Sequence, residues 1–90
     1  MRIDLFLKKV YIARSRSAAA RLCEEDKISV NGRPAKSSKD VKPEDVVSVT
    51  LGSKELTFSI VALPEGNVSK AQAPSFYRIT SLKRTPEVFE

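Results

Sequence analysis

The sequence predicts an α+β fold in which two short helices pack on a small, curved and mainly antiparallel sheet. Apolar residues recur with helical spacing near the N-terminus, and they alternate with polar residues further along, between residues 46 and 63. An Asn-Gly pair between these regions marks a tight hairpin. The chain of 90 residues has the length of one domain, which we expect to span residues 1–90.

Two helices are predicted before residue 26. The first has one apolar face, formed at spacings i, i+3, i+4 and i+7 by Ile3, Phe6, Leu7 and Val10. On another face Asp4 precedes Lys8 by one turn, an order that favours attraction between them. Ser15 is a good N-cap for a second helix running from about Arg16 to Glu25. Its buried stripe is expected to consist of Ala19, Leu22 and Cys23.

The strands are predicted from alternation and turn residues. A half-buried strand at 28–30 leads into the Asn31-Gly32 hairpin, and Pro34 places the returning strand at a sheet edge. Further strands are expected at 46–51, at 56–63 and, as a short last strand, at 76–79. Within the single domain, residues 2–51 form the core motif, residues 56–80 supply supporting strands and residues 81–90 form a frayed tail.

The charge is unevenly distributed along the chain. The net charge is +5 and the sequence pI is about 9.6, which favours a polyanionic partner. Residues 2–21 contain six basic residues and one acid, whereas residues 46–90 contain five basic and four acidic residues. This concentration at the N-terminal end is typical of a phosphate-binding surface.

The start of the second helix gives the sharpest local argument for nucleic acid. A helix N-terminus presents unpaired amides and the positive end of a dipole, so it favours phosphate. Arg14 and Arg16 lie near that start, and Ser17 and Arg21 follow on the outer side one turn apart. Arginines in this position can add bidentate phosphate contacts. They are also compatible with an ordinary solvated helix face.

Composition excludes several kinds of chemistry. With one cysteine and no histidine, the chain cannot form an internal disulfide or a Ser-His or Cys-His nucleophile, and a zinc site is not expected. We therefore expect no cofactor, no metal and no enzymatic activity. No apolar run is long enough to cross a bilayer, and there is no signal-peptide core. These features predict a cytoplasmic protein that does not bind membranes.

Residues 2–51 resemble the S-four (alpha-L) RNA-binding domain, named after the fourth protein of the small ribosomal subunit. The matching features are the RIDLFL helix, a basic residue before an SRS helix start, a strand ending in VNG, a Lys-rich loop, and Pro-x-Asp before a strand. The whole chain is also similar to a narrower group of small bacterial proteins. These are ribosome-associated proteins of the heat-shock protein fifteen type and the related ribosome quality-control factor of Gram-positive bacteria.

The resemblance implies binding to structured ribosomal RNA and tRNA on the large ribosomal subunit. In that group the target is a dissociated subunit that still carries a nascent chain on peptidyl-tRNA. The positions that match the family's RNA contacts are Arg2, Lys8, Arg14, Arg16, Ser17, Arg21, Lys36 and Lys39. Asp26 and Glu44 depart from the pattern, because glycine usually stands at both positions. We expect the chain to act as a monomer.

Three other functions remain open from the sequence. Two helices with a short link also suit a DNA-binding helix-turn-helix. An RNA-modifying enzyme is a second alternative, although no residues remain here for a catalytic domain. A protein–protein adaptor that uses the sheet is the third. The sequence also leaves open whether the role is heat-shock recycling or nascent-chain tailing.

Overall fold

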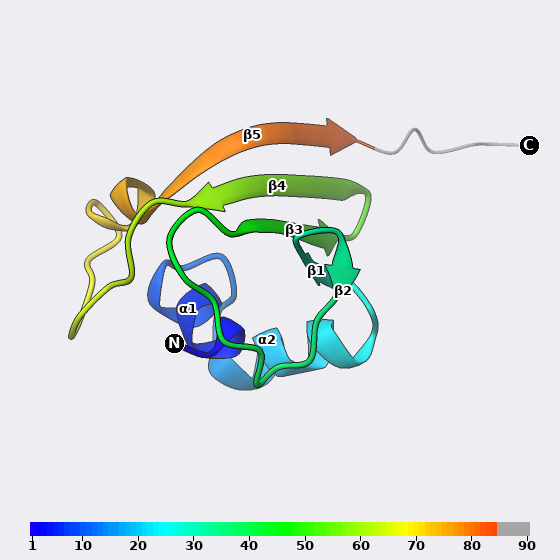
Figure 1. The fold of residues 1–90 in the computed structure, drawn as a ribbon, viewed down its shortest axis with the longest axis horizontal. Helices are drawn as coiled ribbons and strands as arrows, with labels where there is room; N and C mark the ends of the chain where they lie inside the picture. The colour runs from blue at the N-terminus through cyan, green and yellow to red at the C-terminus, as the bar shows by residue number, and fades with distance from the viewer. Residues whose placement is uncertain (85–90) are drawn as a thin grey trace, which may run out of the picture.

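The computed structural model describes residues 1–84, and residues 85–90 lie outside the description. Two helices, α1 (Ile3–Lys9) and α2 (Arg16–Glu24), lie against one face of a five-stranded sheet (Figure 1). The sheet is antiparallel, with strand order β2-β1-β3-β4-β5. Its elements are β1 (Ile28–Val30), β2 (Arg33–Pro34), β3 (Val46–Leu51), β4 (Lys54–Ile60) and β5 (Tyr77–Arg84), with the 3-10 turn η1 (Ala73–Phe76) before the last strand. The predicted α+β class is confirmed.

The core lies between α1 and the sheet. The apolar face of α1 is buried as the spacing predicts, and Phe6 stacks on Phe58 of β4 with ring centroids 6.2 Å apart. The ring centroids of Phe58 and Tyr77 of β5 are 5.3 Å apart, and the planes of the two rings are tilted by 58°. This row of aromatic rings joins the first helix to the last strand and contributes apolar burial to a small domain.

The predicted cap and hairpin are present. The hydroxyl of Ser15 accepts a hydrogen bond from the Ala18 amide at 3.0 Å, which fixes the start of α2. Asn31 and Gly32 have φ angles of 53° and 84°, as a tight turn between β1 and β2 requires. The side chain of Asn31 also donates to the buried Asp45 carboxylate at 3.1 Å. This bond ties the hairpin to the entrance of β3.

Strand β5 is longer than predicted. It pairs with the whole of β4, from Ile60 opposite Tyr77 to Lys54 opposite Arg84. Residues 81–84 therefore belong to the sheet, and assigning them to a frayed tail was wrong. The rest of that tail, 85–90, lies outside the described residues. β5 is an edge strand, and its Ile79 and Leu82 are 53% and 59% exposed. The strand therefore lacks the alternation that marks a half-buried strand.

Asp26 and Glu44 occupy turns with left-handed backbone geometry. Their φ angles are 57° and 78°, in the region that glycine adopts without steric cost. The turns are therefore kept even though carboxylate side chains replace the glycine that the family pattern usually has. Among residues 1–84, no helix combines the length and apolar character needed to cross a membrane.

Candidate nucleic-acid interface

The N-terminal ends of the two helices meet at a buried carboxylate. Asp4 is 3% exposed, and its Oδ2 lies 3.1 Å from Arg2 Nη2 and 3.4 Å from Arg16 Nε. Its other oxygen, Oδ1, accepts a hydrogen bond from the Leu5 amide at 2.7 Å. The two arginine side chains remain 46% and 48% exposed. Asp4 therefore holds two guanidinium groups, one from the residue before α1 and one from the first turn of α2, side by side at the surface. Both retain donors for another anion.

Asp4 does not pair with Lys8, the residue one helical turn away. The helical spacing predicted that these two would attract each other, but Asp4 turns inward and meets the start of α2. A buried carboxylate without a nearby cation costs much more free energy than an exposed lysine without an acid, because water solvates only the exposed charge. Lys8 is consequently left exposed on α1, without an ion pair within residues 1–84.

The loop after β2 holds the start of α1 in place. The Ile3 and Asp4 amides donate to the carbonyls of Lys39 and Ser37 at 2.8 and 3.3 Å. In the other direction, the Val41 amide donates to the Met1 carbonyl at 2.8 Å. The first two bonds satisfy amides that a helix leaves unpaired at its start. Together the three bonds bring the lysine-rich loop next to Arg2.

The first turn of α2 carries Arg16 and Ser17, both exposed. The Ser15 side chain occupies the Ala18 amide, and the Ser15 carbonyl accepts from the Ala19 amide at 3.1 Å. Within residues 1–84, no hydrogen bond engages the amides of Arg16 and Ser17. These amides lie at the positive end of the helix dipole beside a fixed guanidinium group, which is a favourable environment for phosphate.

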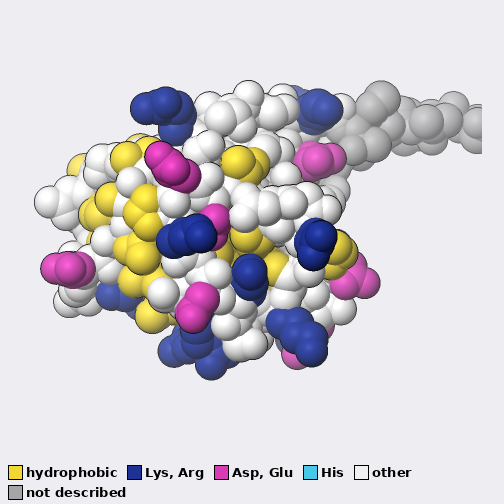
Figure 2. All heavy atoms as spheres, in the orientation of Figure 1, with side chains coloured by type: hydrophobic (Ala, Val, Ile, Leu, Met, Phe, Trp, Pro, Cys, Tyr) yellow, Lys and Arg dark blue, Asp and Glu magenta, His cyan; other side chains and the backbone are white. Residues whose placement is uncertain are grey.

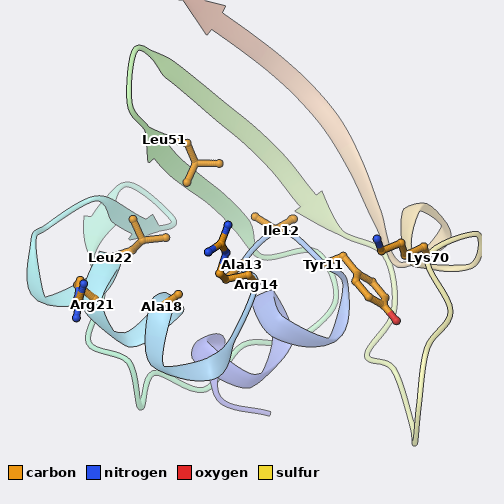
Figure 3. Close-up of a pocket in the computed structure, with 9 residues that line it drawn as sticks. All are labelled: Tyr11, Ile12, Ala13, Arg14, Ala18, Arg21, Leu22, Leu51 and Lys70. Atoms are coloured by element: carbon orange, nitrogen blue, oxygen red, sulfur yellow. The ribbon is translucent and has the colours of Figure 1, made fainter.

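Arg14 and Arg21 line a hollow of about 670 Å³ next to the same helix. Residues of the α1–α2 link, of α2 and of the end of β3 form its walls, and Figure 3 shows the Arg14 side chain turned toward the hollow. Arg14 also borders a smaller depression of about 180 Å³ together with Lys8 and Lys9. Arg14 therefore connects the basic residues of α1 with those of α2.

Lys36 and Lys39 are exposed and line a separate hollow with Arg33 of β2. Lys36 also borders a depression formed with Cys23 and Glu24 at the end of α2. Neither lysine makes an ion pair within residues 1–84. The structure therefore brings Arg2 and Arg16 into one cluster and Lys8, Arg14 and Arg21 around the link, while the two lysines lie along an adjoining loop.

The surface is not uniformly positive. Figure 2 shows basic and acidic side chains interspersed over the face it presents. Charge density alone therefore does not define the interface. What distinguishes it is the fixed arrangement at the helix starts, which we name the Asp4 cluster (Asp4, Arg2 and Arg16).

Asp4 and Lys9 have roles in this region that the sequence interpretation missed. The partner of Asp4 lies on another helix, so periodicity along α1 gives no sign of the contact. Lys9 Nζ donates to the Gly66 carbonyl at 2.7 Å, across 57 residues of sequence. Cys23 is a buried core residue, as predicted; burial raises the pKa of its thiol, and the nearby Asp4 and Glu24 carboxylates raise that pKa further.

Comparison with known proteins identifies the class. The S4 domain family model matches residues 1–47, which contain the Asp4 cluster, α2, the hairpin and the lysine-rich loop. The chain therefore belongs to the S4 domain family.

Within that family, the chain is homologous over nearly its full length to a named group of small proteins. It is 34% identical to the RQC P-site tRNA stabilizing factor of Bacillus subtilis, over 97% of this chain and 100% of that protein. It is 37% identical to the factor of the same name from Listeria innocua, over 97% of this chain and 94% of the relative. The trimeric structure of Vibrio cholerae heat shock protein 15 matches with a TM-score of 0.84 and 28% identity, covering 90% of this chain and 82% of that one. Both groups that the sequence resembled are thus among its relatives.

Proposed function

We propose that this chain is a non-catalytic RNA-binding protein that acts on the large ribosomal subunit. It binds structured ribosomal RNA and tRNA, and it serves in the rescue or quality control of stalled subunits that carry a nascent chain on tRNA. It acts in the cytoplasm. The relatives named as P-site tRNA stabilizing factors support this assignment, because they match almost the whole chain.

The Asp4 cluster is the observation that carries the proposal. Two arginines at the starts of the two helices share one buried carboxylate oxygen, at 3.1 and 3.4 Å, and both stay about half exposed. Holding a guanidinium in place before binding reduces the side-chain entropy that a phosphate contact would otherwise cost. Each arginine keeps free N–H donors that can engage a phosphate or a base edge.

The remaining basic residues suit phosphate neutralisation along a folded RNA. Lys8, Arg14 and Arg21 extend the surface around the link, and Lys36 and Lys39 extend it along the loop that holds α1. An A-form RNA helix is recognised mainly through its shape, its phosphates and its 2′-hydroxyls. A rigid pair of arginines flanked by freer cations fits that kind of recognition better than base-by-base readout.

The test is sedimentation with purified bacterial large subunits on a density gradient. The wild-type chain should comigrate with the subunits at moderate salt and dissociate at high salt, because phosphate contacts release counterions. Arg16→Ala and Arg21→Ala should each weaken this association without unfolding the protein; for Arg16→Ala we expect roughly tenfold, the size of a charge-assisted contact. Arg78→Ala on β5 is the matched control, since it removes an exposed arginine from outside the S4 match.

Three outcomes would contradict the proposal. The first is comigration of both Arg16→Ala and Arg21→Ala with the large subunits to the same extent as the wild-type chain. The second is efficient competition by duplex DNA where structured RNA fails, which would indicate a DNA-binding module. The third is association that does not respond to salt, which would point to a protein partner on the ribosome.

A further inference from the structure

The hollow beside α2 combines an apolar floor with a basic rim. The floor is formed by aliphatic side chains of the link, of α2 and of β3: Ile12, Ala13, Ala18, Leu22 and Leu51. Arg14, Arg21 and Lys70 supply the cationic side chains of the hollow, and Figure 3 shows Arg21 at one side of the lining, Lys70 at the other and Arg14 between them. Among the described residues, no acidic side chain lines it.

Such a composition suits a ligand that is flat and apolar on one side and anionic on the other. A volume of about 670 Å³ is in the range of pockets that bury a small molecule or one nucleotide, and it is too small for a helix. Leu51 is 38% exposed at the end of β3, so part of the floor is uncovered in this structure. Three cations without a carboxylate beside them favour an anion over an apolar peptide.

Tyr11 provides an aromatic ring at the edge of the hollow. Its side chain is 49% exposed, yet its hydroxyl donates to the Val68 carbonyl at 2.7 Å. Lys70 Nζ lies 5.9 Å from the ring centroid, within cation–π range. These contacts with the loop after β4 hold an exposed ring in a fixed position, which is what a stacking surface for a base requires.

The backbone at Tyr11 is strained. Its φ is 63°, a left-handed conformation that bulky residues rarely adopt. Strained non-glycine residues concentrate at ligand-binding sites, where the surrounding contacts hold them in place. The Tyr11–Val68 hydrogen bond is such a contact, and the bond from Lys9 to the Gly66 carbonyl is a second one nearby.

We propose that this hollow binds one unstacked nucleotide of the RNA that the chain recognises. The base lies on the aliphatic floor against Tyr11, and its phosphate lies between the cations of the rim. This inference rests on the proposed function, since Arg14 and Arg21 belong to both surfaces. It adds a base-dependent contact to an interface that otherwise recognises backbone and shape.

The chain offers a direct optical test. It contains two tyrosines and no tryptophan, so a Tyr77→Phe background leaves Tyr11 as the source of tyrosine fluorescence. The probe is single-stranded hexauridylate, compared with a hexamer of the same backbone that lacks bases. Hexauridylate should quench Tyr11 saturably, and the abasic hexamer should bind about 5- to 150-fold more weakly, the range for loss of one stacking contact.

Leu51→Glu places a carboxylate and a polar side chain on the floor of the hollow, and it should weaken hexauridylate binding by a similar factor. Val46→Glu is the matched control, because Val46 lies in the same strand with 39% exposure, away from the hollow. The Val46→Glu chain should respond to hexauridylate as the background does. Circular dichroism of both variants checks that the sheet remains folded.

The inference is overturned if hexauridylate does not quench Tyr11, if the abasic hexamer binds equally well, or if Leu51→Glu and Val46→Glu behave alike. Binding to large subunits separates this failure from failure of the proposed function. If Leu51→Glu binds subunits normally while Arg16→Ala does not, the nucleotide hollow is wrong and the interface stands. If Leu51→Glu weakens subunit binding equally at low and moderate salt without any response to hexauridylate, the hollow takes a protein segment instead.

Discussion

The Asp4 cluster and the lysine-rich loop carry the same sign of charge but hold it in different ways. In the cluster, Arg2 and Arg16 are anchored by a buried carboxylate and stay about half exposed. In the loop, the backbone is fixed by bonds to the start of α1, while the side chains of Lys36 and Lys39 make no ion pair within the described residues. An anchored arginine therefore presents its donors to an anion in a fixed direction, whereas an unanchored lysine contributes mainly to the positive electrostatic potential of the surface.

Removing the anchor should have the largest effect. Asp4→Asn keeps the shape of the side chain but removes the charge that holds both arginines. Because the site is buried while its partners are half exposed, we expect unfolding to become easier by about 1–3 kcal/mol, and RNA affinity to fall roughly tenfold. Denaturant unfolding and binding to large subunits measure the two effects.

Asp40→Asn is the control for the loss of Asp4. Asp40 pairs with the N-terminal ammonium at 3.7 Å, and its side chain is 87% exposed. Its removal should change stability by less than about 0.5 kcal/mol, as expected for an exposed pair. Equal effects of the two substitutions would show that burial of Asp4 is unimportant and would remove the distinction between anchored and unanchored cations.

Loss of the loop lysines should have a smaller and more uniform effect. Lys36→Ala and Lys39→Ala should each weaken binding about two- to threefold at moderate salt, and each should reduce the slope of log affinity against log salt by about one. Titrations at several salt concentrations measure both quantities. A tenfold loss from either lysine, matching Arg16→Ala, would show that an unanchored side chain contributes as much to binding as an anchored one.

Glu44→Gly should affect the stability of the turn before β3 more than RNA binding. Glu44 has a φ of 78°, where glycine avoids the steric cost of a side chain. We expect the substitution to stabilise the fold by about 0.5–1 kcal/mol, while RNA affinity rises less than twofold from the lost negative charge. Thermal unfolding and subunit binding provide the readouts. A large gain in affinity would mean that the electrostatic potential near the loop contributes more to binding than the fixed positions of Arg2 and Arg16.

The most local effect of losing Asp4 is expected at Cys23, whose thiol lies near the Asp4 carboxylate. Burial raises the pKa of this thiol above its ordinary value, followed by the effects of Asp4 and Glu24, so the folded state favours the neutral form. The contribution of this thiol to the free energy of unfolding is therefore present at neutral pH. It is lost as the pH rises above 9.0, the ordinary pKa of a cysteine thiol. In Asp4→Asn this pKa should fall, and thiol modification at pH 8 should become a few-fold faster. An unchanged rate would mean that Asp4 carries no charge next to Cys23.

The sequence predicts local structure correctly where the residues that determine it are close together in the chain. The apolar face of α1, the Ser15 cap and the Asn31-Gly32 turn each depend on neighbours within about one or two turns of chain. The left-handed geometry at Asp26 and Glu44 is also where the family pattern has glycine. The class of fold followed from these elements together.

Contacts between distant residues could not be predicted in this way. Asp4 was assigned to the surface of α1 beside Lys8, because helical spacing does not report a second helix that covers it. The bonds from Tyr11 and Lys9 to the loop after β4 span 57 residues each. The sequence predicts too short a last strand, because the exposed apolar residues of β5 do not alternate with buried ones. Only their pairing with β4 shows that the strand continues to Arg84.

The two edges of the sheet are protected in different ways. One edge is β2, a strand of two residues that includes Pro34, which has no amide to donate to another strand. The other is β5, eight residues long, with Ile79 and Leu82 exposed and with Arg78, Lys83 and Arg84 along it. Like charges on this long edge disfavour strand-to-strand growth between copies of the chain. The basic residues of β5 therefore act against aggregation, and replacing them with neutral side chains should make concentrated solutions form β-rich assemblies.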